Sequence, residues 1–154
     1  MYSLYSALIY SIYLFVHLFS LWNKKAKCWM KGQQTTQKFI HHFATLPPDT
    51  SPLYWFHCAS LGEFEQARPL LEEIKKRNPS IRILLTFFSP SGYEVRKNYP
   101  LATYVLYLPL DTPLFLLPFI DAFKPTVLFL AKYDFWPNLI SLLYKRKVPI
   151  LAFS

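Results

Sequence analysis

A chain of 154 residues is long enough for one domain with a substantial core, and its formal net charge of +8 favours an anionic partner such as acidic lipid or a phosphorylated substrate. The two cysteines, Cys28 and Cys58, are far apart and lack metal-ligand spacing, which argues against a metal site or a disulfide framework. Because no nucleic-acid-binding motif accompanies the positive charge, we do not expect a nucleic-acid partner.

Residues 1–22 contain no Asp, Glu, Lys or Arg and are rich in Leu, Ile, Tyr and Phe. As a helix this segment would be about 33 Å long, enough to cross a bilayer core, so it predicts a membrane anchor. The positive charges follow it, which by the positive-inside rule places the rest of the chain in the cytosol. These charges are Lys24, Lys25, Lys27 and Lys31. The alternative is an amphipathic helix that lies on the membrane or packs on the domain.

Residues 23–52 are expected to form a basic juxtamembrane segment and a linker. The pattern predicts only a short helix near 37–43, followed by a turn-rich stretch with Pro47, Pro48 and Pro52. The globular domain is then expected to comprise residues 53–154.

Apolar runs and helical stripes alternate through residues 53–154. The expected strands are Leu53–Ala59, Ile81–Phe87, Ala102–Leu106, Thr126–Leu130 and Pro149–Phe153. The expected helices run over 63–77, from about 91 to 98, from about 112 to 123, and from about 136 to 145. This alternation predicts an α/β fold with a Rossmann-like parallel sheet and right-handed crossovers.

All four strand-to-helix corners of such a sheet lie at its carboxyl edge, where α/β proteins bind ligands. We therefore take the polar residues and glycines of these corners as candidate site residues. They are Ser60, Gly62 and Glu63, then Ser89, Ser91 and Gly92, then Asp111, and finally Lys132, Tyr133 and Asp134.

The first corner has two interpretations. Ser60-x-x-Glu63 has the spacing of a capping box, in which each side chain bonds the other residue's backbone N–H. Glu63 is also the one acidic side chain at this corner, and Gly62 leaves room for a ligand beside it, so Glu63 is also a candidate catalytic base.

The same corners resemble the bacterial transferases of 3-deoxy-D-manno-octulosonic acid (Kdo), and the resemblance extends over nearly the whole chain. It is carried by Trp55–Phe64 with the family pattern H-x-x-S-x-G-E, by Leu85–Gly92, by Tyr107–Asp111 and by Asp134–Asn138. Four motifs in the right order are far more specific than any one of them.

The resemblance implies the N-terminal, acceptor-side half of a two-domain GT-B glycosyltransferase. It implies that Glu63 is the general base, which takes a proton from a sugar hydroxyl of lipid A precursor (lipid IVA) during attack on CMP-Kdo. It also implies an inverting reaction that uses no metal and no cofactor, with CMP-Kdo as the donor substrate. The candidate substrate-binding residues are Ser60, Gly62, Ser89, Ser91, Gly92 and Asp111.

The fourth corner departs from the family. Many members have E-x-E-x-W-P there, whereas this chain has Lys132 in place of the first acid and the shorter Asp134 in place of the second. Lys132 could bind a phosphate or the donor carboxylate, or it could be a solvated loop charge. Asp134 could belong to the site or could be a helix N-cap.

The expected partners are an anionic glycolipid and the bacterial inner membrane, with the globular part on the cytoplasmic face. The four lysines after residue 22 and Arg68 would give the lipid phosphates a cationic approach. The second GT-B domain, which would hold the nucleotide, is expected to be missing from these 154 residues, so the chain alone should be inactive. The alternative function is a non-catalytic membrane-anchored module that binds acceptor lipid or a partner chain.

Overall fold

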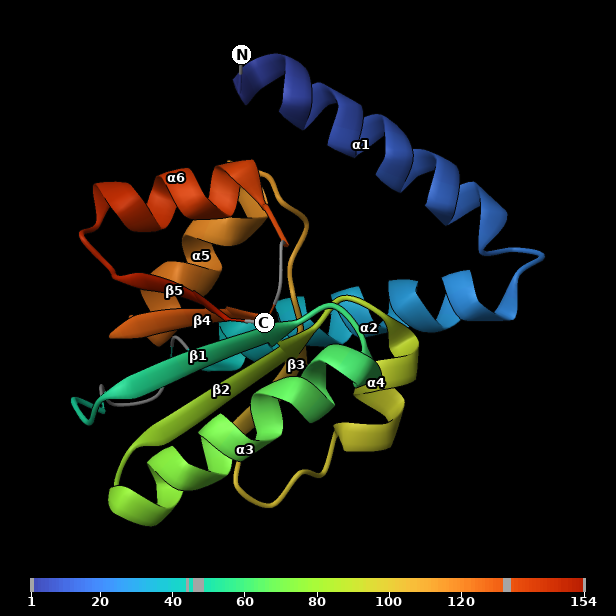
Figure 1. Ribbon diagram of the computed structural model, residues 1–154. Helices are drawn as coiled ribbons and strands as arrows, with labels where there is room; N and C mark the ends of the chain where they lie inside the picture. Colours follow the sequence, from blue (N-terminus) through green and yellow to red (C-terminus); the bar gives the residue numbers. More distant parts are fainter. Residues whose placement is uncertain (1, 44, 46–48, 132–133, 154) are drawn as a thin grey trace.

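The computed structural model describes residues 2–43, 45, 49–131 and 134–153, and it confirms the α/β fold with a five-stranded parallel sheet (Figure 1). The strands are β1 (Leu53–Cys58), β2 (Arg82–Phe87), β3 (Tyr104–Tyr107), β4 (Val127–Ala131) and β5 (Ile150–Phe153). Their order in the sheet is β3-β2-β1-β4-β5, and all four neighbouring pairs are parallel. The chain therefore moves outward from β1 in one direction to β3, then crosses to the other side for β4 and β5.

This order places a topological switch point between β1 and β4. These two strands are neighbours in the sheet, with Trp55 opposite Leu128 and His57 opposite Leu130. The helices that follow them, α3 (Leu61–Arg77) and α6 (Pro137–Lys145), pack on opposite faces of the sheet. Ligand sites of open α/β sheets lie at such a point.

Helices cover both faces of the sheet because β1, β2 and β4 are apolar on both sides (Figure 1). The helices of one face are α3 (Leu61–Arg77) and α4 (Pro90–Arg96). The helices of the other face are α2 (Lys24–Phe43), α5 (Pro113–Phe123) and α6 (Pro137–Lys145). Phe64 of α3 and Phe119 of α5 are both fully buried against the sheet.

The helix α2 is far longer than the short helix that the sequence predicts, and much of the expected linker belongs to the packed domain. Its buried face includes Trp29, Gln33, Thr36 and Ile40, which recur every three or four residues. The two polar members bond the backbone at the end of the edge strand β3: Gln33 Nε2 donates to Leu108 O at 2.8 Å, and Thr36 Oγ1 accepts from the Tyr107 amide at 3.2 Å. Polar side chains on the buried face hide the helical pattern in the sequence.

The expected membrane-spanning helix is not supported, because no helix among the described residues is both long enough and apolar enough to cross a bilayer. The helix α1 (Tyr2–Phe19) has 18 residues, about 27 Å at 1.5 Å per residue, and Ser and His side chains dilute its apolar sequence. One side of it packs on the domain through Ile9, Tyr13 and Val16. The described structure thus favours the packed-helix alternative for this segment.

Candidate active site at the carboxyl edge

The carboxyl end of β1 runs directly into the first turn of α3, where Glu63 folds back on the chain. Ser60 is the N-cap, and its Oγ accepts from the Glu63 amide at 3.5 Å. Glu63 Oε2 in turn accepts from the amides of Ala59 and Ser60. The predicted capping box is therefore confirmed. Within the described residues, these bonds involve only Oε2, which leaves the other oxygen for a ligand.

Asp134 lies beside this cap, in the loop between β4 and α6. Burial and the charge of Glu63 raise the Asp134 pKa to about 6, whereas the Ala59 N–H lowers it. Glu63 and Asp134 thus lie close enough at the switch point for the charge of Glu63 to raise the Asp134 pKa. Carboxylates whose pKa is perturbed by burial and a charged neighbour are frequent in active sites.

Asp134 does not cap α6, although its place before the helix makes it a candidate cap. The N-cap position of α6 is Trp136, which makes no side-chain capping bond. The backbone amides of Asn138 and Leu139 are instead bonded by Asp111, at 3.2 Å and 2.8 Å. The Asp134 carboxylate is therefore not engaged in capping α6.

His57 places an imidazole directly behind this pair, and sequence reasoning assigned it no role. Its side chain is fully buried, and its Nε2 lies 3.7 Å from Asp134 Oδ2, whose side chain is 25% exposed. Its Nδ1 lies 3.0 Å from Thr86 Oγ1 on the adjacent strand β2. Burial lowers the His57 pKa to about 3, so the ring is neutral at physiological pH. The signal in the sequence was a histidine within an otherwise apolar and aromatic strand.

The second corner supports the first by close packing. Ser89 caps α4, with its Oγ accepting from the Ser91 amide at 3.3 Å and lying 2.9 Å from Ser91 Oγ. A methyl group on Gly92 would lie 2.4 Å from the Phe87 ring and 3.1 Å from the Leu61 amide. Gly92 therefore allows α4 to approach the start of α3.

Gly62 differs from Gly92 because the space around it is open. A methyl group on Gly62 would meet only Ser60 Oγ, at 4.0 Å, and the residue is exposed. Neither packing nor a left-handed backbone requires glycine at this position. The open space lies one residue from Glu63, where a substrate could approach it.

Asp111 differs from the other candidates because its carboxylate is engaged by the backbone of α6. It is 2% exposed, and both of its carboxylate oxygens accept backbone hydrogen bonds from α6. Burial raises its pKa, and Tyr5 of α1 lies beside it. The Asn138 side chain completes the junction by donating to the Asp111 carbonyl and to Ser6 Oγ. Asp111 therefore joins α6 and α1 to the end of β3.

The basic candidates fall into two groups. Lys132 and its neighbour Tyr133 lie outside the described residues. Arg68 is held on α3 by two acids, with its guanidinium 3.3 Å from Glu65 and 3.7 Å from Glu72. The exposed lysines of α2 include Lys24, Lys25, Lys27 and Lys31.

A chain of aromatic side chains extends from His57, and these residues were not predicted as site residues. The Trp136 ring lies 5.8 Å from His57 and 5.1 Å from Phe88, and Phe88 lies 5.8 Å from Trp29. Phe88 is 39% exposed and Phe135 is 72% exposed. Exposed aromatic faces at this edge are suited to contact apolar parts of a ligand.

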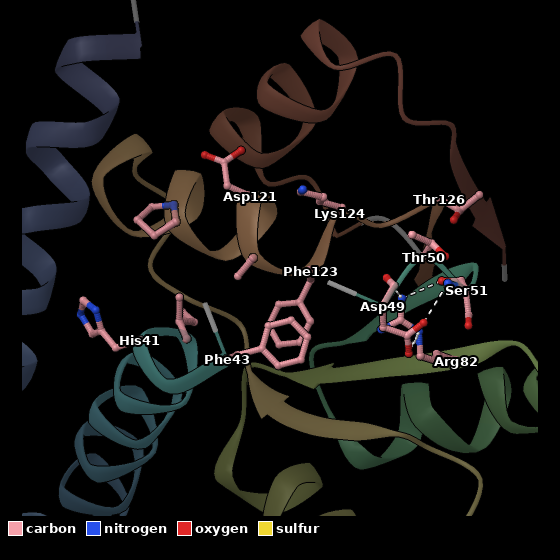
Figure 2. Close-up of a pocket in the computed structure, with 13 residues that line it drawn as sticks. His41, Phe43, Asp49, Thr50, Ser51, Arg82, Asp121, Phe123, Lys124 and Thr126 are labelled. Carbon is pink, nitrogen blue, oxygen red and sulfur yellow. Dashed lines mark hydrogen bonds and ion pairs between the residues drawn. The ribbon is translucent and has the colours of Figure 1, made fainter. Parts of the chain in front are cut away.

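A cavity of about 730 Å³ lies at the opposite, amino end of the sheet (Figure 2). Arg82 lines it and is engaged with Asp49, 3.2 Å from its carboxylate, and with the Ser51 carbonyl. These contacts tie the segment before β1 to β2. The cavity is therefore separate from the carboxyl-edge site.

Comparison with known proteins gives a consistent result. Residues 29–154 match the sequence model of a family described as 3-deoxy-D-manno-octulosonic-acid transferase (kdotransferase). The chain is 33% identical over 144 residues to a protein of Arabidopsis thaliana named "Probable 3-deoxy-D-manno-octulosonic acid transferase, mitochondrial". The aligned region covers 90% of this chain and 31% of the Arabidopsis protein.

Two bacterial relatives carry the name 3-deoxy-D-manno-octulosonic acid transferase. The Aquifex aeolicus protein is 38% identical over 101 residues, or 65% of this chain and 28% of that protein. The Haemophilus influenzae protein is 33% identical over 109 residues, or 70% of this chain and 25% of that protein. The chain thus spans about a third or less of the length of these relatives.

Proposed function

Because this chain belongs to the 3-deoxy-D-manno-octulosonic acid (Kdo) transferase family, we propose that it forms the acceptor-side part of a Kdo glycosyltransferase. In this proposal the donor is CMP-Kdo and the acceptor is lipid A precursor, lipid IVA. The observation that supports it best is the carboxylate pair of Glu63 and Asp134 at the switch point of the sheet. It lies where α/β folds bind ligands, in the motif that resembles the family.

Glu63 acts as the general base. A hydroxyl oxygen of the acceptor sugar attacks the anomeric carbon of Kdo, the bond from that carbon to the CMP phosphate breaks, and the hydroxyl proton passes to Glu63. A single displacement of this kind inverts the anomeric centre and uses no metal or other cofactor. The capping role is compatible with this chemistry, because the cap engages Oε2 and the proton can pass to the second carboxylate oxygen.

Asp134 acts as the second carboxylate of the site. Its pKa is raised first by burial and then by the charge of Glu63, which supports a role for the two carboxylates in one site. When ionised, the Asp134 carboxylate can accept a hydrogen bond from a second sugar hydroxyl. The corner residues Ser60 and Gly62 border the same space, whereas Asp111 serves mainly to hold α6.

The acceptor is proposed to be an anionic glycolipid reached from the cytoplasmic face of the bacterial inner membrane. The outer side of α1 exposes large apolar residues, and the exposed lysines of α2 follow it in the chain. An apolar helical face beside a basic segment is typical of helices that lie on an anionic membrane surface. The exposed apolar residues include Leu4, Leu8, Leu14, Phe15, Leu18, Leu21 and Trp22.

A chimera tests this proposal. Residues 29–154 would replace the matching part of the Aquifex aeolicus transferase, and the product would be assayed with CMP-Kdo and lipid IVA. We expect transfer by the chimera and loss of transfer in its Glu63→Gln variant. A folded chimera that binds lipid IVA but transfers nothing, beside an active parent, would instead support a non-catalytic lipid-binding module.

A further inference from the structure

The fully buried His57 carries one ring nitrogen that has no hydrogen-bond partner among the described residues. That atom, Nε2, is directed at Asp134 Oδ2, which also lacks a partner there and lies 3.7 Å away. This distance is too long for a hydrogen bond, and no other described polar side chain satisfies either atom. Two buried polar groups left unpaired and facing each other need an explanation, because each costs stability.

The hydroxyl of Thr86 determines which ring nitrogen of His57 carries the hydrogen. Thr86 Oγ1 accepts from Trp55 Nε1 at 2.8 Å, and an indole nitrogen can only donate. The hydroxyl has one hydrogen of its own, and it can direct it to His57 Nδ1 at 3.0 Å or to the Phe56 carbonyl at 3.4 Å. The shorter contact is to the ring, and on this basis we assign Nδ1 as the acceptor and Nε2 as the nitrogen that carries the hydrogen.

We propose that His57 is a positioning residue for Asp134, with its Nε2–H held by Thr86 so that it donates to the Asp134 carboxylate. This inference rests on the proposed function, in which Asp134 is the second carboxylate of the site. His57 belongs to the central strand β1 and is surrounded by core, whereas Asp134 belongs to a loop. Closing the gap to a hydrogen bond of about 2.8 Å therefore moves the carboxylate by about 1 Å.

This contact gives the two carboxylates different roles. A neutral N–H donor stabilises the ionised form of Asp134 and draws it toward β1. Glu63 then keeps its place on the helix cap and is the group that takes the proton. The titratable groups that surround the Asp134 carboxyl among the described residues are His57 and Cys58 on β1 and Glu63 on α3. Burial raises the Cys58 pKa, so that thiol stays uncharged.

Two substitutions separate the two nitrogens of the ring. In His57→Gln the side-chain amide nitrogen can reach the position of Nε2 and keep the bond to Asp134. In His57→Asn the shorter amide reaches only Thr86, and the donor to Asp134 is lost. Both variants replace a neutral polar ring by a neutral amide in the same strand, so each serves as the control for the other.

Nuclear magnetic resonance of the 154-residue chain tests the inference without activity. With ¹⁵N-labelled histidine we expect the neutral Nε2–H form of His57 from about pH 5 to 8. With ¹³C-labelled aspartate we expect the Asp134 titration to move to higher pH in His57→Asn and to stay near its original value in His57→Gln. A Nδ1–H tautomer, or an Asp134 titration that both variants leave unchanged, would overturn the proposal.

Transfer by the chimera gives the second readout. His57→Asn should lower the rate by about tenfold, the effect of one lost hydrogen bond to a charged group, and shift the acidic limb of the pH profile upward. His57→Gln should keep most of the rate. Equal losses without a shifted limb would indicate a merely structural histidine and overturn the inference. If the unaltered chimera transfers nothing, the proposed function fails, whereas the resonance titrations still decide the role of His57.

Discussion

Glu63 and Asp134 converge on one backbone amide, the N–H of Ala59. Glu63 Oε2 accepts from this amide, and the same amide is close enough to the Asp134 carboxyl to lower its pKa. Burial of Asp134 and, after it, the charge of Glu63 outweigh this amide, and the Asp134 pKa rises to about 6. The helix cap and the Asp134 carboxylate are thus linked through the Ala59 amide, which directly follows β1.

Replacing Glu63 by Gln should separate catalysis from capping. Gln keeps an oxygen that can accept from the Ala59 and Ser60 amides, so the melting temperature of the chain should change little. Transfer by the chimera should fall by about 10²–10⁴, the usual contribution of a general base. Glu63→Ala should lose activity and also about 1 kcal/mol of stability, because the cap is lost. Near-normal transfer by folded Glu63→Gln would leave Glu63 only its capping role.

The stability of the chain should depend on the ionisation of Asp134. Its folded-state pKa of about 6 exceeds the ordinary value of 3.8, so the folded protein binds this proton more tightly than the unfolded chain does. Stability is therefore lost as the pH rises from about 4 to about 6, and the loss persists at higher pH. Asp134→Asn removes the charge, and it should raise the melting temperature near pH 7.5 but not below about pH 4. A lower melting temperature at neutral pH would contradict this.

The strands and the first helix cap could be predicted because their signals are local. The apolar run from Leu53 and the spacing of Ser60 and Glu63 require only neighbouring residues; the cap is as predicted, and the strand ends at Cys58, one residue before the predicted end. The carboxyl edge followed from the alternation of strands and helices. The pairing of Glu63 with Asp134 could not be predicted, because it depends on β1 lying next to β4 in the sheet.

The remaining misses have physical causes of the same kind. The face that α2 buries includes Gln33 and Thr36, whose polar groups bond the end of β3, so its sequence resembled a linker. Asp134 precedes α6 and resembled its cap, but Asp111 from another loop supplies the oxygens. In each case a polar side chain forms hydrogen bonds with backbone that is distant in sequence, and a local sequence pattern cannot reveal such bonds.

Asp111→Asn should destabilise the fold, since the carboxylate accepts from two amides of α6. The Asn amide group presents N–H hydrogens to one of those donors, and the expected loss is about 1–3 kcal/mol for a buried group left unsatisfied. Asp121→Asn is the matched control. Asp121 is exposed and pairs with Arg146 at 2.6 Å, and such a surface pair contributes at most about 1 kcal/mol. Chemical denaturation of both variants measures the difference, and equal losses would contradict the capping role of Asp111.

Binding to lipid vesicles should depend on the outer side of α1. Leu8 is 57% exposed and Phe15 is 67% exposed, so a charge at either position should leave the fold intact. We expect Leu8→Glu and Phe15→Glu to reduce cosedimentation with vesicles that contain anionic lipid, because an interfacial helix binds through its apolar face. Leu151→Glu changes a residue of β5 that is 51% exposed and serves as the control. Unchanged binding by the α1 variants would remove this helix from the proposed membrane surface.

The two corner glycines allow the substrate space to be distinguished from packing. Gly62→Ala adds a methyl group to an open position in the first turn of α3, where Ala is favoured over Gly by about 1 kcal/mol. The variant chain should therefore be as stable as the original or more so. If an acceptor sugar lies beside Glu63, the same methyl group should intrude on it and weaken transfer by the chimera, with the Michaelis constant for lipid IVA raised.

Gly92→Ala is the contrasting variant, because its methyl group would collide with the Phe87 ring and press on the Leu61 amide. It should cost about 1–3 kcal/mol of stability, as overpacking of a buried position does. Thermal unfolding and transfer measured on both variants distinguish an effect on the substrate from an effect on packing. A stable Gly62→Ala protein with reduced transfer would place the acceptor next to Glu63. A stable Gly62→Ala protein with unaltered transfer and an unaltered Michaelis constant would show that the acceptor lies elsewhere on the carboxyl edge.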